Sequence, residues 1–412
     1  MRVLISGASI AGPVLAYWLT RRGFDVTVVE RAPALRKTGG HAIDLFRPAM
    51  DITEQMGVLP QVQARGTGTS RLIIKRASSR RAVNLDYLKI QQVISDRHIE
   101  IMRDDLSQIY YDAARDDVEY LFGDEITAIS DDGRVAFDHA APRTYDVIVG
   151  ADGLHSGVRK LVFGPSEKEA AGHTNFLGGY LAVLSVPKEL AREGELTTIL
   201  EPNRMAMIYT ADHLDDARAV FLLWPPAELD YHHRDDSRQR QLLREAFTGL
   251  NPEVDRWLAE LGSPGHAGPG AFYFDSITQL ELTSWSRGRV TLVGDAGYCP
   301  GPAVGGSTSL AVLGAYVLAG ELERAGSDYT AAFADYERVM RDPVVRSRAF
   351  AKTVAKTIMP SSELGVWALV SLARVISLLP MRMTNAVAKL NDGGVRLYDT
   401  MRAPDYPVPA SR

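Results

Sequence analysis

Short apolar runs and segments of helical periodicity alternate at the start of the chain. Residues 1–6 and 24–29 are apolar runs of strand length, and residues 13–22 between them carry apolar positions at helical spacing. The linking turn at 7–12, Gly-Ala-Ser-Ile-Ala-Gly, consists mainly of small residues. This pattern predicts a β–turn–α–β unit and therefore an α/β fold.

Two later apolar runs extend the same prediction. Residues 146–151 and 290–296 are typical of strands buried in a parallel sheet. Asp152 directly follows the first run, and Asp295 lies near the end of the second. Because ligands of open α/β sheets gather at the carboxyl ends of the strands, we expect both acids at the same crevice as the first turn.

The rest of the chain has more ordinary patterns. Helices are expected at 48–56, 95–114, 308–323, 329–341, 344–359 and 364–379, with two more across 236–261. Strands are expected in a meander at 118–122, 126–130 and 135–138, in a basic-faced hairpin around 71–83, and at 174–187, 197–210 and 218–224. The apolar segment 364–379 is short for a bilayer span and contains Arg374, so a buried helix between domains is favoured over peripheral membrane contact.

The first turn has the chemistry of a dinucleotide site. A strand that feeds a tight turn leaves the first N–H groups of the next helix unpaired, and a pyrophosphate can bind them. Glu30 follows Gly7 by 23 positions and can accept hydrogen bonds from ribose hydroxyls, which favours FAD or NAD over NADP here. Ser9 replaces the middle glycine of GxGxxG, so a tight turn without a ligand stays open as an alternative. A serine-hydrolase elbow fails because Ala11 replaces its last glycine.

The third strand end adds a flavin-like feature. A proline- and glycine-rich loop follows Asp295 and precedes a long helix. Asp295 can bond sugar or ribityl hydroxyls, while backbone N–H groups at the helix start can face a planar ring that carries negative charge. Three distant segments are therefore predicted to converge on one elongated ligand.

Composition narrows the class of protein. The chain has 412 residues, enough for two or three domains, and 46 basic against 51 acidic residues argue against a nucleic-acid surface built on charge excess. The single cysteine, Cys299, excludes an internal disulfide framework and fits a reducing compartment. We find no signal peptide and expect a cytoplasmic protein without stable membrane insertion. The nine histidines show no metal-ligand spacing.

Several separated motifs are similar to those of the single-component flavoprotein aromatic hydroxylases, which have the para-hydroxybenzoate hydroxylase fold. The tetracycline-inactivating and actinobacterial antibiotic-pathway members are especially similar. The motifs are GASIAGP with Glu30-Arg31, the Gly39-Gly40 turn, EIMRDDL around Arg103, VGADGLHSGVR at 149–159, and LVGDAGYCPGPAVGG at 292–306. The resemblance spans nearly the whole chain.

This resemblance implies a division into parts. It implies a Rossmann-like, discontinuous FAD-binding domain at 1–72, 96–172 and 270–345. A substrate domain of mixed sheet plus helices is inserted at 73–95 and 173–269, and a C-terminal helical segment at 346–412 bridges the domains.

The resemblance also implies roles for single residues. The first turn would bind the pyrophosphate, Glu30 the adenosine ribose, and Arg103 with Asp295 the ribityl chain and pyrophosphate. Asp152 belongs to a motif linked to FAD and NAD(P)H. The complete set of implied FAD-binding residues is Gly7, Ser9, Ile10, Ala11, Gly12, Glu30, Arg31, Arg36, Gly40, Arg103, Asp152, Asp295, Pro302, Gly305 and Gly306. The chain departs from the family pattern at Ser307 and Ser309, which replace glycine and asparagine, at Tyr298, which replaces histidine, and at Gly314-Ala315, which replaces Asp-Ala.

The implied activity is that of an FAD-dependent monooxygenase. NADPH or NADH would reduce the flavin, dioxygen would form a flavin hydroperoxide, and oxygen would pass to an aromatic or polycyclic small molecule such as an antibiotic or natural-product intermediate. Because this transfer needs no obligatory acid–base pair, no catalytic residue is assigned. An oxidoreductase of the same fold without oxygen insertion, and a flavin-loaded binding protein, remain alternatives. Candidates for the substrate-pocket wall, each also compatible with ordinary core packing, are Tyr180, Met205, Met207, Tyr209, Phe221, Trp224, Phe272 and Phe274.

Overall fold

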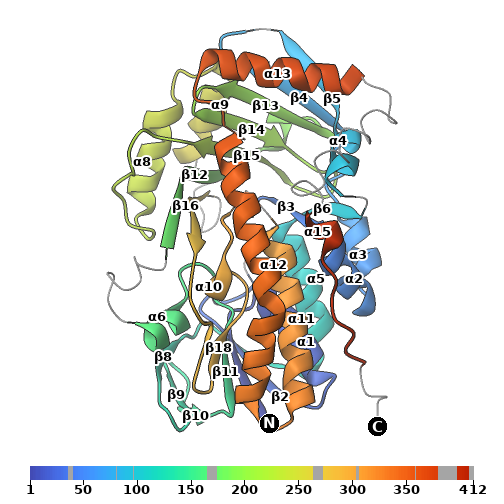
Figure 1. Ribbon diagram of the computed structural model, residues 1–412. Helices are drawn as coiled ribbons and strands as arrows, with labels where there is room; N and C mark the ends of the chain where they lie inside the picture. Colours follow the sequence, from blue (N-terminus) through green and yellow to red (C-terminus); the bar gives the residue numbers. More distant parts are fainter. Residues whose placement is uncertain are drawn as a thin grey trace.

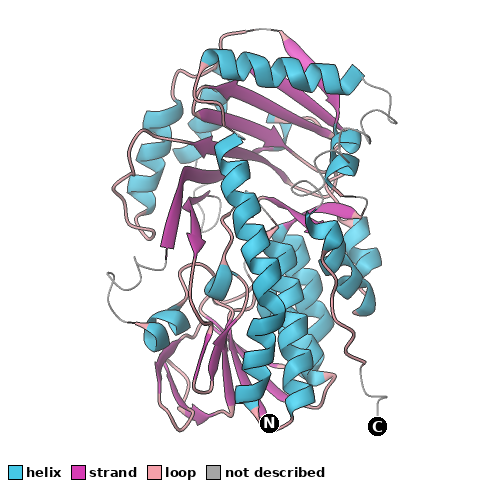
Figure 2. Ribbon diagram, viewed as in Figure 1, coloured by secondary structure: helices cyan, strands magenta, loops and turns pink. Residues whose placement is uncertain are grey.

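The computed structural model describes residues 1–35, 40–79, 81–95, 97–164, 174–262, 272–302, 306–357, 359–378 and 397–407. Two large sheets dominate it, one in the lower half of Figure 1 and one in the upper half. The predicted α/β class is confirmed (Figure 2). Within the described residues, no helix combines the length and apolar character that a bilayer span requires.

The lower sheet has six strands and contains the first predicted unit. In spatial order the strands are β17 (Ser286–Arg287), β18 (Val290–Leu292), β11 (Val147–Gly150), β1 (Arg2–Ser6), β2 (Asp25–Glu30) and β7 (Glu119–Phe122). All neighbouring pairs are parallel except β17 with β18. The three predicted strand ends therefore lie beside one another, because β1, β11 and β18 are adjacent and run in the same direction.

Three helices pack around these strand ends. They are α1 (Ala11–Thr20), α5 (Arg103–Ala114) and α11 (Ser307–Ala325), and α1 contacts both of the others. Helix α11 is buried over most of its length, with fourteen consecutive buried residues from Ser309 to Leu322. A helix that is apolar on all sides must be covered on all sides, and α11 is enclosed by α1, α2 (Arg47–Gln55) and α12 (Tyr329–Thr357).

The upper sheet has seven strands and two covered faces. In spatial order the strands are β16 (Phe272–Leu280), β12 (Thr174–Pro187), β15 (Asp216–Leu223), β14 (Arg204–Tyr209), β13 (Glu195–Glu201), β4 (Arg71–Arg76) and β5 (Ala82–Asp86). Helices α8 (Asp236–Phe247) and α9 (Pro252–Ala259) cover one face. Helices α12 and α13 (Glu363–Leu378) pack against the other.

Smaller elements complete the fold. The three-stranded sheet is formed by β8 (Ile126–Ile129), β9 (Arg134–Phe137) and β10 (Arg143–Thr144), and a two-stranded ribbon by β3 (Ala42–Phe46) and β6 (His98–Met102). The short helices are α3 (Leu59–Ala64), α4 (Tyr87–Ile94), α6 (Gly157–Phe163), α10 (Asp295–Tyr298) and α15 (Leu397–Thr400).

Two of the predicted elements each correspond to two consecutive elements in the structure. The helix expected at 95–114 is the strand β6 followed by α5, because the alternating residues 98–102 pair with β3. The strand expected at 197–210 is the hairpin β13–β14, whose turn is made possible by Asn203 at a φ of 60°. Asparagine adopts this left-handed conformation more readily than most residues do.

Three other predictions are wrong in detail. The helices expected at 329–341 and 344–359 form one helix, α12, with Pro343 inside it. Burial of Met340 and Val344 on either side of the proline holds the helix continuous. Strand β7 pairs with β2 rather than with the predicted meander. The 290–296 strand ends at Leu292, and Asp295 begins α10.

The contacts also revise the predicted division of the chain. Strand β16 was assigned to the FAD-binding part at 270–345, but it pairs with β12 in the upper sheet. Helix α12 contacts both α11 and β12, and so it bridges the two halves, as Figure 1 shows. Helix α13 was expected to bridge as well, but it packs against β5 and β13 of the upper sheet.

Candidate flavin site

The first turn requires glycine at both ends. Gly7 has a φ of 108°, and a Cβ there would lie 2.5 Å from the Ala151 carbonyl oxygen. A Cβ on Gly12 would lie 1.9 Å from the carbonyl oxygen of Gly7. Both positions therefore exclude any side chain, and the absence of side chains lets the ends of β1 and β11 pack together.

The start of α1 has no side-chain cap. Ile10 precedes the helix and makes no side-chain capping bond, so the first N–H groups of α1 have no side-chain cap at this position. Glu30 lies beside the turn, where its carboxylate accepts hydrogen bonds from the Ala8 N–H at 3.0 Å and the Ala32 N–H at 2.8 Å. Glu30 is thus held in place by backbone groups at the end of β2.

Helix α5 brings a cation to the same turn. Arg103 Nη2 donates to Ser9 Oγ at 3.2 Å, and Ser107 Oγ donates to the Ser9 carbonyl at 3.0 Å. The predicted proximity of Arg103 to the first turn is therefore present, although the two are far apart in sequence. Ser107 has no place in the predicted motif, because a serine within an amphipathic helix carries no distinctive signal.

The segment before β3 lies on the other side of Arg103. The Arg103 N–H donates to the His41 carbonyl at 3.3 Å, and the Gly40 N–H donates to Asp104 Oδ2 at 3.3 Å. A Cβ on Gly40 would lie 2.8 Å from Asp104 Oδ1. Burial, reinforced by the Arg103 charge, lowers the pKa of His41 to about 4, so His41 is neutral at physiological pH.

The third segment closes the arrangement. Gly294 has a φ of 65°, and a Cβ there would lie 3.2 Å from Ala311 Cβ and 3.4 Å from Ala11 Cβ. The residue before Asp295 is therefore wedged between α1 and α11. Burial raises the pKa of Asp295, and the nearby positive charge of Arg103 opposes this rise. The two charges are thus close enough to influence each other.

Asp152 has a local partner. Its carboxylate accepts hydrogen bonds from the N–H groups of Gly157, at 2.8 Å, and Val158, at 3.1 Å, and so caps α6. Arg159 Nη1 donates to the Ala296 carbonyl at 2.8 Å and joins this loop to α10. Asp152 lies at the predicted strand end, and its carboxylate orders the loop there.

Of the remaining predicted residues, some are described by the structure and others lie outside the described ranges. Gly306, at the start of α11, has a φ of 56°, and a Cβ there would lie 2.2 Å from Tyr398 Cζ. Arg31 is exposed, and Pro302 is partly exposed. Arg36 and Gly305, together with Gly39, lie outside the described residues.

The departures from the family motif have packing partners within this chain. Ser309 Oγ accepts a hydrogen bond from the Phe46 N–H at 3.0 Å. Tyr336 Oη donates to Tyr298 Oη at 3.1 Å, and a Cβ on Gly314 would lie 1.9 Å from that same Tyr298 oxygen. Tyr298 therefore fits because position 314 has no side chain.

A titratable cluster that sequence patterns missed lies at the edge of β16. His155 Nε2 is 2.8 Å from Asp275 Oδ2, to which Tyr273 Oη donates at 3.4 Å. Burial and the Asp275 charge raise the pKa of Tyr273, while the Arg103 charge opposes this effect. An aspartate in the middle of the 272–280 strand was the available signal. The His155–Asp275 contact connects the upper sheet with the loop that follows β11.

The predicted substrate-pocket residues divide between the two faces of the upper sheet. On the face that α8 and α9 cover, the structure places Tyr180, Phe221, Phe272 and Phe274. On the opposite face, against which Met102 of β6 also packs, it places Met205, Met207, Tyr209 and Trp224. Tyr209 Oη accepts a hydrogen bond from the Ala42 N–H at 2.5 Å, so the second face adjoins the β3–β6 ribbon.

The comparison with known proteins decides the family. Residues 1–327 match the model of the FAD binding domain. The chain belongs to this family. A flavin-dependent monooxygenase of Legionella longbeachae is 32% identical over 366 residues, which are 88% of this chain and 91% of that protein. An uncharacterized Mycobacterium tuberculosis protein (strain CDC 1551 / Oshkosh) is 41% identical over 353 residues, 84% of this chain and 91% of its own length. The crystal structure of tetracycline destructase Tet(55) superposes with a TM-score of 0.80 at 31% identity, and 98% of each chain is covered.

These findings identify an FAD-dependent monooxygenase of the class A flavoprotein hydroxylase group. The residues present fit FAD. The first turn excludes side chains where a pyrophosphate approaches, and Arg103 supplies a positive charge beside it. Glu30, at the end of β2, lies beside this turn and offers a carboxylate that can accept hydrogen bonds.

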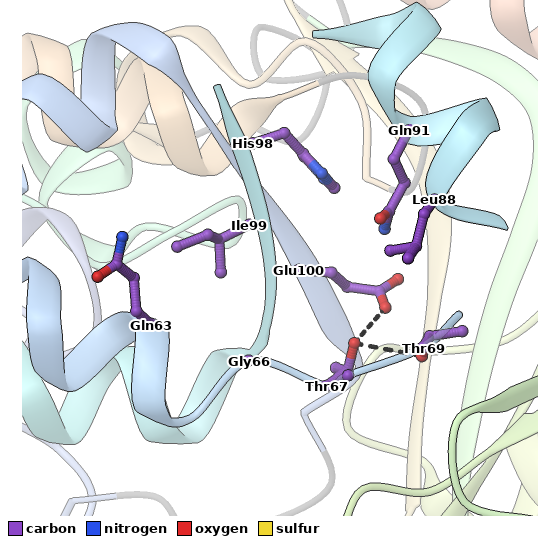
Figure 3. Close-up of a pocket in the computed structure, with 10 residues that line it drawn as sticks. Gln63, Gly66, Thr67, Thr69, Leu88, Gln91, His98, Ile99 and Glu100 are labelled. Atoms are coloured by element: carbon purple, nitrogen blue, oxygen red, sulfur yellow. Dashed lines mark hydrogen bonds between the residues drawn. The ribbon is translucent and has the colours of Figure 1, made fainter. Parts of the chain in front are cut away.

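The monooxygenase also has a cavity of about 270 Å³ behind the β3–β6 ribbon (Figure 3). Glu100 lines it and accepts hydrogen bonds from Thr67 Oγ1 at 2.5 Å and Tyr87 Oη at 3.2 Å. His98 Nε2 is 2.6 Å from Asp44 Oδ1 on the neighbouring strand. Burial and the Asp44 charge raise the pKa of Glu100.

Glu100→Gln is expected to stabilise the FAD-loaded enzyme at pH 8. The pKa of Glu100 is higher in the folded state than in the unfolded chain. Ionisation of Glu100 therefore destabilises the fold as pH rises above the ordinary pKa of glutamate, and glutamine at this position removes that effect. We expect Tm to rise by about 1–2 °C at pH 8 and the gain to vanish near pH 4. Differential scanning calorimetry across pH measures both.

Glu281→Gln is the matched control. The hydrogen bond from Lys352 lowers the pKa of Glu281, so its ionised form stabilises the fold above the ordinary pKa. This variant should lose stability at pH 8, or show no gain. A Tm gain of Glu100→Gln that is the same at pH 4 and pH 8 would contradict the linkage.

Proposed function

We propose that this monooxygenase uses NAD(P)H and dioxygen to oxygenate an aromatic or polycyclic small molecule, with an antibiotic or natural-product intermediate as the substrate class. The observations that carry the proposal are the hydrogen bond from Arg103 to Ser9 in the first turn and the adjacency of the parallel strands β1, β11 and β18, which brings the three segments together. The similarity to flavin-dependent monooxygenases and to a tetracycline destructase supports the substrate class.

We assign the FAD contacts to the residues that the family motifs imply. They are Gly7, Ser9, Ile10, Ala11, Gly12, Glu30, Arg31, Arg36, Gly40, Arg103, Asp152, Asp295, Pro302, Gly305 and Gly306. We assign residues 1–72, 96–172 and about 281–345 to the FAD-binding domain, since β16 pairs within the upper sheet. The substrate domain then comprises 73–95 and 173–280.

When bound, FAD supplies the redox chemistry that links NAD(P)H oxidation to dioxygen activation. The chain itself holds and shields the reacting groups. Arg103 would neutralise the pyrophosphate charge, and the α1 N–H groups would orient it. Tyr209 of the upper sheet and Met102 of β6 belong to one buried cluster, which would exclude water from the substrate side.

The test is an assay of the FAD-loaded enzyme with NADH or NADPH, ¹⁸O₂ and tetracycline as the probe. We expect substrate-stimulated NAD(P)H oxidation and a product that carries one ¹⁸O atom. NAD(P)H-dependent conversion without the label would instead identify an oxidoreductase that does not insert oxygen. Tight probe binding with no change in NAD(P)H oxidation would identify a binding protein.

A further inference from the structure

Helix α13 has two apolar faces, of which one is covered. Val366 is fully buried, and Leu369 and Ala373 pack with it against the upper sheet. On the other side, Leu364 is 73% exposed and Trp367 is 55% exposed. In Figure 1 the helix lies across the top of the molecule, with the sheet on one side only.

Most of the exposed apolar positions of α13 lie along one line, and Leu372 lies to one side of it. Along the helix this line contains the exposed Leu364 and Trp367, the partly exposed Ser371, and the exposed Val375 and Leu378. The successive intervals are 3, 4, 4 and 3 residues. At about 100° per residue, all five lie within about 40° of one line, opposite Val366. We call these five residues the α13 seam.

The seam is symmetric about Ser371. Read in either direction along the helix, the intervals are the same, so Leu364 corresponds to Leu378 and Trp367 corresponds to Val375. A two-fold axis through Ser371 would pair each residue with its counterpart on an antiparallel second copy. An isologous interface requires this kind of self-complementary pattern, because if residue i contacts j then j contacts i.

We propose that the α13 seam is a homodimer interface in which the α13 helices of two copies pack antiparallel about Ser371. Four large side chains exposed by 55–77% offer about 500 Å² per protomer, or about 1,000 Å² in the pair, which is the lower limit for a specific interface. The dimer is therefore weak and reversible. Arg374 would lie opposite Ala368 of the second copy, where a small residue leaves room for its aliphatic stem.

The small number of charged residues on α13 favours a second copy of the chain, rather than a lipid surface, as the partner of the seam. A helix that binds a membrane interface carries several lysines or arginines on its polar face. Among the side chains described for α13, Arg374 is the one basic group and Glu363 the one acidic group, so electrostatic attraction to anionic lipid is small. The face opposite the seam is also occupied by the upper sheet.

Analytical ultracentrifugation of the FAD-loaded full chain, from about 1 to 200 μM, tests the interface. We expect the mass to rise from 45.1 kDa toward twice that value, with a micromolar Kd. Leu364→Glu places two charges in the seam and should raise Kd at least tenfold. Leu372→Glu is the matched control, because Leu372 is 58% exposed but lies about 100° from the seam.

A second measurement depends on the symmetry. Ser371→Cys should form a disulfide-linked dimer on mild oxidation, since each Ser371 would face its counterpart, and the native Cys299 is fully buried. Flavin content should be unchanged in all three variants. A wild-type protein that stays monomeric throughout, or a dimer that resists Leu364→Glu, overturns the proposal. Monomers that cosediment with phosphatidylglycerol vesicles through the seam would overturn it in favour of a lipid surface.

Discussion

Gly314→Ala is expected to lower the free energy of unfolding by about 3 kcal/mol. The new Cβ would lie 1.9 Å from Tyr298 Oη, in a part of α11 that is buried on all sides. Tyr298 cannot move away freely, because Tyr336 donates a hydrogen bond to its oxygen. The collision therefore outweighs the gain of about 1 kcal/mol that alanine brings to a helix interior.

A double-mutant cycle isolates this collision. Tyr298→Phe removes the oxygen and should cost at most about 1 kcal/mol, since Tyr336 keeps the Leu292 carbonyl as an acceptor at 3.0 Å. The variant that carries both substitutions should be more stable than Gly314→Ala alone by about 1–2 kcal/mol, because the nearest remaining ring atom is 3.1 Å away. Urea titration of the FAD-loaded and FAD-free proteins gives all four energies.

Gly66→Ala is the control for a glycine substitution without a collision. Its Cβ would meet no atom closer than 3.5 Å, so the change should stay within about 0.5 kcal/mol. If the losses from Gly314→Ala and Tyr298→Phe simply add in the double variant, the two positions are not coupled. The packing explanation for the Tyr298 departure would then fail.

Arg103→Met is expected to raise the Kd for FAD about 100-fold, which corresponds to about 2.7 kcal/mol. Arg103 donates a hydrogen bond to Ser9 in the first turn. Its positive charge also limits the rise that burial causes in the pKa of Asp295. Without it, a pyrophosphate at the turn loses a charge-assisted contact, and the pKa of Asp295 rises further. Flavin fluorescence titration of the deflavinated protein measures the affinity.

Arg65→Met is the matched control for the loss of a cation. Arg65 Nη1 lies 3.8 Å from Oδ1 of Asp105, a residue of α5, the helix that also carries Arg103. The Arg65 side chain is 43% exposed, and Asp105 is outside the proposed site. FAD affinity should stay within about twofold of wild type, since an exposed ion pair contributes little. Equal losses in the two variants would indicate a general destabilisation of α5 rather than a cofactor contact.

The sequence by itself determined the elements whose signals are local. The β1–turn–α1–β2 unit follows from periodicity and from Gly7 and Gly12, and the three buried strands follow from unbroken apolar runs. Arg103, Asp295 and Glu30 could be proposed as site residues from the sequence because the motifs that contain them are short and contiguous. Gly12 needed no tertiary information, since a Cβ there would meet the carbonyl of Gly7 in the same turn.

Only the tertiary structure decided the pairings between distant residues. No local signal shows that Asp152 caps α6, that Tyr298 requires a glycine at 314, or that Tyr398 occupies the space beside Gly306. The separate identity of β6 likewise depends on its pairing with β3. These features are fixed by contacts between segments far apart in the chain. A local pattern reports what a residue prefers, while the neighbour that satisfies the preference is set by packing.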